Sequence, residues 1–298
     1  MSAKPLYFFT VANHGYVDMV KNTAESMRRA GIRQPLHVYC FDSNTFDALS
    51  ALNLANQIVP HAFLIPLSHD LTNYATAEYK KIIYKKFDVI CYLLENIEQT
   101  EADVFFYLDS DVVMLKDPTA EVRKLLSSPS PVDLLFQKGG QPSDPEYGMR
   151  CTGVIAFRNT AGLLPLFTVE KADAHLVYDY SDGDQGYLND RIKTYKCTER
   201  ILPPMLFPNG SYRKNKLFDR KVAYLLHYNW MQSYEKIPSM QADHLWFVGP
   251  VASKAIQIPS RFQRSHQPIP IPSIRPRPVV AKQTGPTLPI SNLRSQFM

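Results

Sequence analysis

Residues 104–111 read Val104-Phe105-Phe106-Tyr107-Leu108-Asp109-Ser110-Asp111, and this stretch decides the fold class of the chain. Its first five residues are continuously apolar, as in a strand that is buried on both faces of a parallel sheet. Ligands of open α/β sheets bind beyond the carboxyl ends of such strands. Two carboxylates at that place are costly unless something neutralises them. The stretch therefore predicts a buried strand that delivers Asp109 and Asp111 to a binding site.

About 100 residues of alternating strand and helix patterns precede this stretch. Apolar runs predict strands at Leu6–Val11, Leu36–Phe41 and Ile58–Pro66, and helices are predicted at Tyr16–Ala30 and Tyr79–Ile97. A strand, a helix and a second strand within about 40 residues indicate a right-handed βαβ unit. The fold class that we expect is α/β with a mostly parallel sheet.

The pattern continues beyond the acidic residues. The sequence predicts a further apolar run at Val112–Leu115, a helix from Asp117-Pro118 through Leu126, and strands at Val132–Phe136 and Gly153–Phe157. The polar loop Lys138–Gly148 between these two strands is of the kind that carries binding residues.

The basic charge of the chain lies in its tail. The formal net charge is +5, but residues 258–298 hold six Lys or Arg residues and no acids, so that 27 basic residues face 28 acidic ones in the rest. The charge distribution therefore argues against a nucleic-acid face on the folded part. Eight of these 41 tail residues are proline. We expect one folded domain at residues 1–257 and a disordered or surface-hugging tail at 258–298.

The sequence lacks cysteine motifs and long apolar segments. The four cysteines have neither a CxxC pair nor the spacing of metal ligands. No stretch approaches the roughly 18 apolar residues that span a bilayer, and the first apolar run is too short for a signal peptide. The expectation is a cytoplasmic protein without a transmembrane segment.

The acidic residues allow two kinds of chemistry. Oxygen ligands suit Mg²⁺ or Mn²⁺, which would bridge a diphosphate and offset charge on a leaving nucleotide. Phosphatases of the haloacid-dehalogenase type also place D-x-D-x-[T/V] after a strand, with the first Asp as nucleophile, and Asp109-Ser110-Asp111-Val112-Val113 fits that pattern. In those phosphatases the motif normally follows the first strand of the domain, whereas about 100 residues of strand and helix pattern precede it here. Its position therefore favours the metal site.

Short motifs elsewhere follow one another in a definite order. They are Thr10-Val11-Ala12-Asn13 with Tyr16, Asn22, Ser26 and Cys40-Phe41-Asp42; Lys86; the acidic motif with Asp117-Pro118; Thr152-Gly153-Val154 with Phe157-Arg158-Asn159-Thr160; Asp184-Gln185 with Asn189; Phe207-Pro208-Asn209-Gly210; and His227-Tyr228-Asn229-Trp230 with Lys236 and Trp246. Together they resemble the nucleotide-diphospho-sugar transferase family, whose members include plant cell-wall xylosyl- and arabinosyltransferases. The resemblance spans residues 6–247. It implies a single-domain GT-A fold, with a Rossmann-like, mostly parallel sheet flanked by helices.

The resemblance also implies roles for individual residues. Contacts with the nucleotide-sugar donor are implied for Thr10, Ala12, Asn13, Asp42, Lys86, Asp109, Ser110, Thr152, Gly153, Asn209, Gly210 and Asn229. A site for Mn²⁺ or Mg²⁺ is implied for Asp109, Asp111 and His227. Catalytic contacts are implied for Asp184, which would position sugar hydroxyls, for Gln185, beneath the anomeric carbon, and for Lys236, on the diphosphate.

Three of these residues have plainer interpretations. His227 in an apolar run could be a core histidine, and Lys236 could be a solvated lysine after a helix. Lys86 could extend its stem along the edge of the apolar stripe of its helix. The sequence leaves both interpretations of each residue open.

Three hypotheses result. The first is a metal-dependent, retaining glycosyltransferase that moves a sugar from a UDP-sugar or a similar donor to a glycan, a glycoprotein or a small-molecule acceptor. The second is a phosphatase with Asp109 as the nucleophile. The third is a catalytically inactive protein that binds sugar nucleotides.

Overall fold

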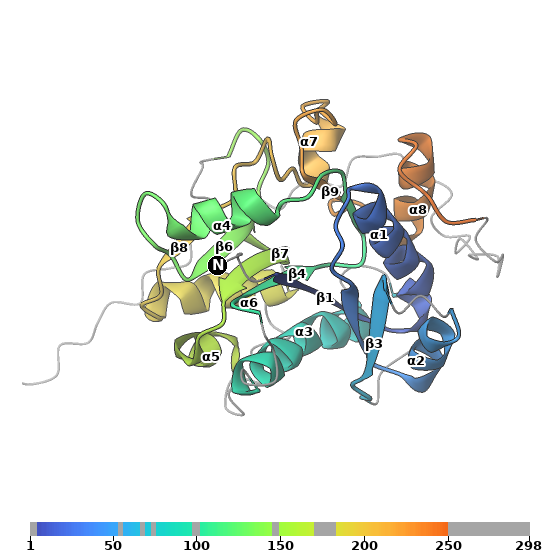
Figure 1. Cartoon of the computed structure of the whole chain (residues 1–298), viewed down its shortest axis with the longest axis horizontal. Helices are drawn as coiled ribbons and strands as arrows, with labels where there is room; N and C mark the ends of the chain where they lie inside the picture. The colour runs from blue at the N-terminus through green and yellow to red at the C-terminus, as the bar shows by residue number, and fades with distance from the viewer. Residues whose placement is uncertain are drawn as a thin grey trace, which may run out of the picture. The chain divides into compact units, whose positions relative to one another are not determined.

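A seven-stranded sheet forms the centre of the protein (Figure 1) in a computed structural model, which describes residues 5–52, 56–65, 69–72, 76–96, 102–144, 149–169 and 183–249. Its order is β3-β2-β1-β4-β7-β6-β8. The strands are β1 (Leu6–Ala12), β2 (Leu36–Cys40), β3 (Ile58–Ala62), β4 (Val104–Leu108), β6 (Leu134–Lys138), β7 (Arg150–Arg158) and β8 (Glu199–Ile201). All five residues of β4 are buried, as the continuous apolar run predicts.

The sheet is mixed but mostly parallel. Strands β3, β2, β1 and β4 run parallel to one another, and β8 runs parallel to β6. Strand β7 lies between β4 and β6 and is antiparallel to both. The prediction of a mostly parallel sheet is confirmed, whereas the reversed β7 was not predicted. The first four strands all end at one edge of the sheet, and Asp109 follows β4 there.

Helices cover both faces of this sheet (Figure 1). Helices α1 (Val17–Arg29), α2 (Ser43–Ser50) and α4 (Thr119–Ser127) contribute to the apolar core of one face. Helices α3 (Ala77–Glu95), α5 (Leu164–Phe167) and α6 (Gly183–Thr194) contribute to the core of the other. The helix predicted at Tyr79–Ile97 is α3, whose apolar positions at three- and four-residue spacing pack on the sheet.

A second, two-stranded sheet brings the end of the folded part to the acidic residues. It pairs β5 (Val112–Met114) with β9 (Leu225–His227) in antiparallel register, with Val112 opposite His227. Helix α7 (Gly210–Lys214) precedes β9, helix α8 (Ser233–Ala242) follows it, and 3₁₀ turns lie at His14–Tyr16 and Ala161–Leu163. The apolar run that begins at Val112 is therefore strand β5, which pairs with β9 and so brings His227 to Asp111.

The differences from the predicted elements are small. The predicted strand at Ile58–Pro66 ends at Ala62, and the helix predicted from Asp117 begins at Thr119. The predicted Pro-rich tail at 258–298 lies outside the described residues. Among the helices that the structure describes, none is long and apolar enough to cross a membrane.

Candidate active site

Side chains of helix α1 hold the acidic turn between β4 and β5 in place. The Thr23 hydroxyl lies within hydrogen-bond distance of two carbonyl oxygens of the turn, Ser110 O at 2.9 Å and Val112 O at 2.8 Å. The backbone N–H of Met114 donates to Ser26 Oγ at 2.9 Å. Because both hydroxyls are buried, these bonds have no water competing for them and fix the backbone between β4 and β5.

Asp109, Asp111 and His227 converge on one point. One possible ligand atom of each lies within 4.8 Å of those of the other two. His227 Nε2 is 3.2 Å from Asp111 Oδ1 and 3.6 Å from Asp109 Oδ2. The Asp111 and His227 side chains are almost completely buried, whereas that of Asp109 is 32% exposed. The structure thus brings the three predicted metal ligands together, with Asp109 on the open side.

Gln137 determines how the His227 ring is oriented. Its amide nitrogen donates to the carbonyl oxygens of Phe207 and Pro208 at 3.1 and 3.0 Å. The amide oxygen therefore faces His227 Nδ1, at 2.8 Å, and accepts its N–H. His227 Nε2 is left to point at the two carboxylates. The sequence interpretation missed Gln137, although an amide directly after the apolar run Leu134–Phe136 is the signal that could have found it.

Lys236 neutralises Asp111 from the other side. Its Nζ lies 2.7 Å from Asp111 Oδ2. Burial alone would raise the pKa of Asp111, but the charges of Lys236 and His227 outweigh it and hold that pKa well below its usual value. Burial likewise lowers the pKa of His227, and the attraction of Asp111 outweighs this and raises it to about 10. Lys236 is a buried residue inside α8, so the alternative of a solvated lysine is wrong.

Lys86 forms a second buried cluster on the other side of Asp109. Its Nζ lies 3.3 Å from Asp109 Oδ1, 2.9 Å from Asp184 Oδ2 and 3.2 Å from the carbonyl oxygen of Thr152. Burial raises the pKa of Asp184 in spite of the neighbouring Lys86. Tyr107 completes the cluster by donating its hydroxyl to Asp109 Oδ1 at 2.5 Å. The Lys86 side chain is 3% exposed, so the alternative of a lysine reaching to the surface is wrong.

Two glycines make room for these contacts. A Cβ on Gly153 would lie 2.3 Å from His227 Cε1 and 2.5 Å from Asp109 Oδ2. A Cβ on Gly210 would lie 1.9 Å from the Asn229 carbonyl oxygen. Any side chain at either position would push these groups apart, because real Cβ atoms do not approach so closely.

The residues predicted to hold the nucleotide lie at the ends of β1 and β2. Thr10 and Ala12 are buried in β1, and Asn13 follows it and donates to the Asp70 carbonyl oxygen at 2.9 Å. Asp42 follows β2 and accepts from the N–H groups of Thr45 and His14 at 2.8 and 2.9 Å. Burial raises the pKa of Asp42, but these bonds outweigh it and lower that pKa. They share the strand-end edge with Asp109.

The remaining predicted residues surround the cluster less closely. Asn209 is buried, caps α7, and donates to the carbonyl oxygens of Lys138 and Gly140 at 2.7 and 2.9 Å. Asn229 Oδ1 accepts from Gly210 N at 2.7 Å. The Gln185 side chain contacts the sulfur of Met149. The next residue after Asn229 is Trp230, which has a left-handed backbone (φ 63°) and is 45% exposed.

A match to a protein-family model shows the family of the chain. The model of the nucleotide-diphospho-sugar transferase family matches residues 31–240, more than two thirds of the chain. The chain belongs to the nucleotide-diphospho-sugar transferase family. No curated protein matches it. Lys86, Asp109, Asp111, Asp184, His227 and Lys236 all lie within the matched residues of this transferase.

Solved structures give the transferase the same fold. One is a glycosyltransferase involved in the glycosylation of the major capsid of PBCV-1 (12% identity, covering 80% of this chain and 100% of that one, TM-score 0.51). Another is the galactosyltransferase LgtC in complex with donor and acceptor sugar analogs (14% identity, 83% and 98%, TM-score 0.52). The predictions of a GT-A fold and of a glycosyltransferase are confirmed, and the family match favours them over the phosphatase.

Proposed function

We propose that this protein transfers a sugar from a nucleotide-diphosphate sugar, with UDP as the nucleotide, to a glycan, glycoprotein or small-molecule acceptor, with the aid of Mn²⁺ or Mg²⁺. The observation that carries the proposal is the convergence of Asp109, Asp111 and His227 within 4.8 Å at the carboxyl edge of a nucleotide-sugar transferase fold. Family membership supports the donor class. The metal, the nucleotide, the acceptor and the residue roles are our proposal.

The three side chains fit a divalent ion. Two carboxylates supply oxygen ligands, and His227 can supply Nε2 once a metal displaces the proton that it carries beside Asp111, because Gln137 accepts the N–H of Nδ1. An imidazole beside two carboxylates favours Mn²⁺ over Mg²⁺, which prefers oxygen ligands and keeps several waters. Such an ion, when bound, would be held by Asp109, Asp111 and His227 and would offset the negative charge that develops on the leaving nucleotide.

Lys236 is placed to serve the diphosphate. It neutralises Asp111 in the structure, and it is free to turn to a phosphate oxygen once a metal ion balances that carboxylate. A lysine at this place would stabilise the negative charge that develops on the leaving group. The donor contacts that we propose around it are those at Thr10, Ala12, Asn13, Asp42, Ser110, Thr152, Gly153, Asn209, Gly210 and Asn229.

The charges of the site support a retaining reaction. Each carboxylate of the two clusters has a lysine partner: Asp111 with Lys236, and Asp109 and Asp184 with Lys86. None of these acids is set up as a general base for the acceptor. We infer a front-face reaction in which the bond from C1 to the phosphate breaks, the bond to the acceptor oxygen forms, and the diphosphate takes the acceptor proton.

Asp184 and Gln185 would then serve the sugar ring. Asp184 would accept hydrogen bonds from the hydroxyls of the sugar while Lys86 holds it, and Gln185 would lie beneath the anomeric carbon. Met149, which contacts Gln185, and Trp230, which follows Asn229, have exposed apolar side chains, and we assign them to the acceptor.

A panel of UDP- and GDP-sugars with Mn²⁺ tests the proposal. Release of the nucleotide diphosphate should depend on the metal and disappear in Asp111→Ala. Release of phosphate from simple monoesters that is lost in Asp109→Asn would instead establish the phosphatase. Donor binding without turnover, whichever acceptor is added, would establish an inactive binding protein.

A further inference from the structure

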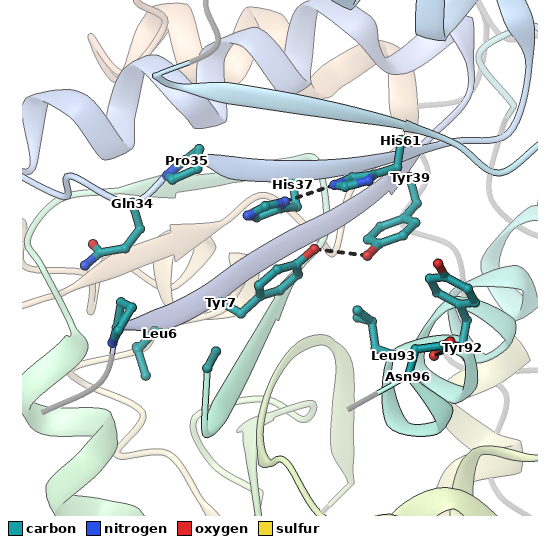
Figure 2. Close-up of a pocket in the computed structure, with 12 residues that line it drawn as sticks. Leu6, Tyr7, Gln34, Pro35, His37, Tyr39, His61, Tyr92, Leu93 and Asn96 are labelled. Atoms are coloured by element: carbon teal, nitrogen blue, oxygen red, sulfur yellow. Dashed lines mark hydrogen bonds between the residues drawn. The ribbon is translucent and has the colours of Figure 1, made fainter. Parts of the chain in front are cut away.

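A pocket of about 410 Å³ lies on the α3 side of the sheet (Figure 2), and none of its described lining residues belongs to the acidic cluster. It opens where β1 and β2 begin, whereas Asp109 and Asp111 follow the end of β4. Figure 2 shows its walls: Tyr7 on β1, His37 and Tyr39 on β2, and His61 on β3, faced by Tyr92, Leu93 and Asn96 from the end of α3.

Four of the lining rings form one connected cluster. Strand alternation brings Tyr7, His37, Tyr39 and His61 to the same face of the sheet. The rings of Tyr7 and His37 stack with centroids 4.0 Å apart, and those of Tyr39 and His61 stack at 4.7 Å. The hydroxyls of Tyr7 and Tyr39 share a hydrogen bond of 3.0 Å, and His37 Nδ1 and His61 Nε2 share one of 2.9 Å.

These two bonds leave hydrogen-bonding groups unused. In each pair one member donates, so the tyrosine pair retains one hydroxyl hydrogen and lone pairs on its oxygens, and the histidine pair retains one N–H and one ring lone pair. The described residues offer these groups no further partner. Two donors and several acceptors therefore line the pocket, and this mixture suits a ligand with hydroxyl groups, which donate and accept alike.

The pocket is also electrically neutral. No Asp, Glu, Lys or Arg is among its twelve described lining residues. Burial, together with the neighbouring imidazole, lowers the pKa of His37 to about 4, and burial lowers the pKa of His61, so both rings are uncharged near pH 7. A phosphate or another charged ligand would find no counter-charge, and the histidine pair spends one nitrogen of each ring on the other.

We propose that this pocket binds a neutral saccharide, one unit of the glycan on which the enzyme acts. Its size falls in the range of small-molecule sites, about 300–1,000 Å³. Aromatic rings with neutral donors and acceptors suit a ring that has apolar faces and a rim of hydroxyls. This inference rests on the proposed function, because it takes the acceptor to be a glycan. A glycan held here would raise the effective concentration of its other units at the transfer site.

Binding of neutral oligosaccharides to the full chain, without nucleotide, tests the proposal. Calorimetry with cellohexaose, xylohexaose, mannohexaose and maltohexaose should find a ligand among the four. Tyr92→Ala, at a 41% exposed residue, should raise its Kd at least about tenfold, as for an aromatic hot spot. Gln34→Ala, at the other end of the pocket, should also weaken binding. The control is Met205→Ala, a side chain of similar exposure (47%) that does not line the pocket, which should leave the Kd unchanged.

Asp111→Asn separates this inference from the proposed function. Saccharide binding that persists in Asp111→Asn and is weakened in Tyr92→Ala supports the pocket, whether or not the enzyme turns over a donor. Binding that is lost in Asp111→Asn but unchanged in Tyr92→Ala and Gln34→Ala would place the saccharide at the transfer site and overturn the inference. So would the absence of binding by all four oligosaccharides.

Discussion

Asp109 and Asp111 are two positions apart in the sequence but belong to differently built halves of the site. Asp111 is 4% exposed at its side chain and is held by His227 and Lys236, which come from the last part of the fold. Asp109 is 32% exposed and is held by Lys86 from α3, a lysine that it shares with Asp184. One half is closed around a single carboxylate, and the other contains two, of which Asp184 is buried and Asp109 is open to solvent.

The difference is one of charge. The Asp111 half has one carboxylate for a lysine and an imidazole, so its excess charge is positive or zero. The Asp109 half has two carboxylates for one lysine, so its excess charge is negative. A divalent cation beside Asp109 and a diphosphate beside Lys236 would balance both halves at once. This is why we expect metal and donor to bind together, and the two halves to respond differently to mutation.

Removal of Asp111, the carboxylate of the closed half, should have the largest effect on the rate of nucleotide release. Asp111→Asn takes away a metal ligand and leaves Lys236 and His227 without their anion, and we expect nucleotide release to fall about 10³-fold or more. Asp109→Asn, on the open side, should cost about 10²-fold, because water can take the place of its oxygen. Initial rates with Mn²⁺ and the best donor measure both. Asp190→Asn, at a surface ion pair, is the control. Equal losses in the two motif variants would contradict the distinction between the halves.

Loss of the shared lysine should be the largest effect on stability. Lys86→Met leaves the buried Asp184 and the partly exposed Asp109 without a cation between them, and breaking a buried pair such as Lys86–Asp184 costs about 3–5 kcal/mol of unfolding free energy. The neighbouring Lys85→Met is a matched control, since the ion pair of Lys85 with Asp88 is exposed and should contribute less than about 1 kcal/mol. Urea unfolding measures both variants. The double variant Lys86→Met with Asp184→Asn should recover part of the loss. A Lys86→Met protein as stable as Lys85→Met would show that the Asp109 half tolerates its own repulsion.

Much of the fold could be read from the sequence because local patterns encode it. The continuous apolar run of β4 and the three- and four-residue spacing of α3 predict their structures without any knowledge of distant contacts. The reversal of β7 could not be read, because the apolar run around Gly153 is the same in either direction. Strands β5 and β9 have three residues each, too few for a periodic signal.

The site could be predicted less completely for the same reason. The acidic motif is local, and the resemblance supplied His227 and Lys236. The partners that orient these residues are distant: Gln137 is 90 positions from His227, and Lys86 is 23 positions from Asp109. A single amide in a buried strand or a single lysine in a helix carries no sign of its partner, so only the folded chain shows that Lys86 lies between two acids.

Removal of Gln137, which orients the His227 ring, should perturb the closed half less. Gln137→Leu removes the acceptor at His227 Nδ1, so the imidazole can rotate or present the wrong nitrogen to a metal. Loss of such an outer partner typically weakens metal binding about 10–100-fold, and an Mn²⁺ titration followed by electron paramagnetic resonance measures it. Cys151→Ala is the control at the same nitrogen: its sulfur lies 3.9 Å away, and a thiol is a weak partner, so the affinity should stay within about twofold. An unchanged Mn²⁺ affinity in a folded Gln137→Leu protein would mean that β9 alone fixes the ring.

The smallest effect should come where the closed half meets solvent. Trp230 and Lys216 both have a left-handed backbone, with φ of 63° and 57°. This conformation costs a residue with a side chain about 1–2 kcal/mol, and glycine avoids the cost. Trp230→Gly and Lys216→Gly should therefore each raise the unfolding free energy by about 1 kcal/mol, less what glycine gains in the unfolded chain. Only Trp230→Gly should slow transfer to the acceptor, with hydrolysis of the donor unchanged in both. If the indole only fills space, the two variants will match in activity as well as in stability. If the indole contacts the acceptor, the strained backbone at Trp230 is retained because a glycine there would relieve the strain but lose the contact.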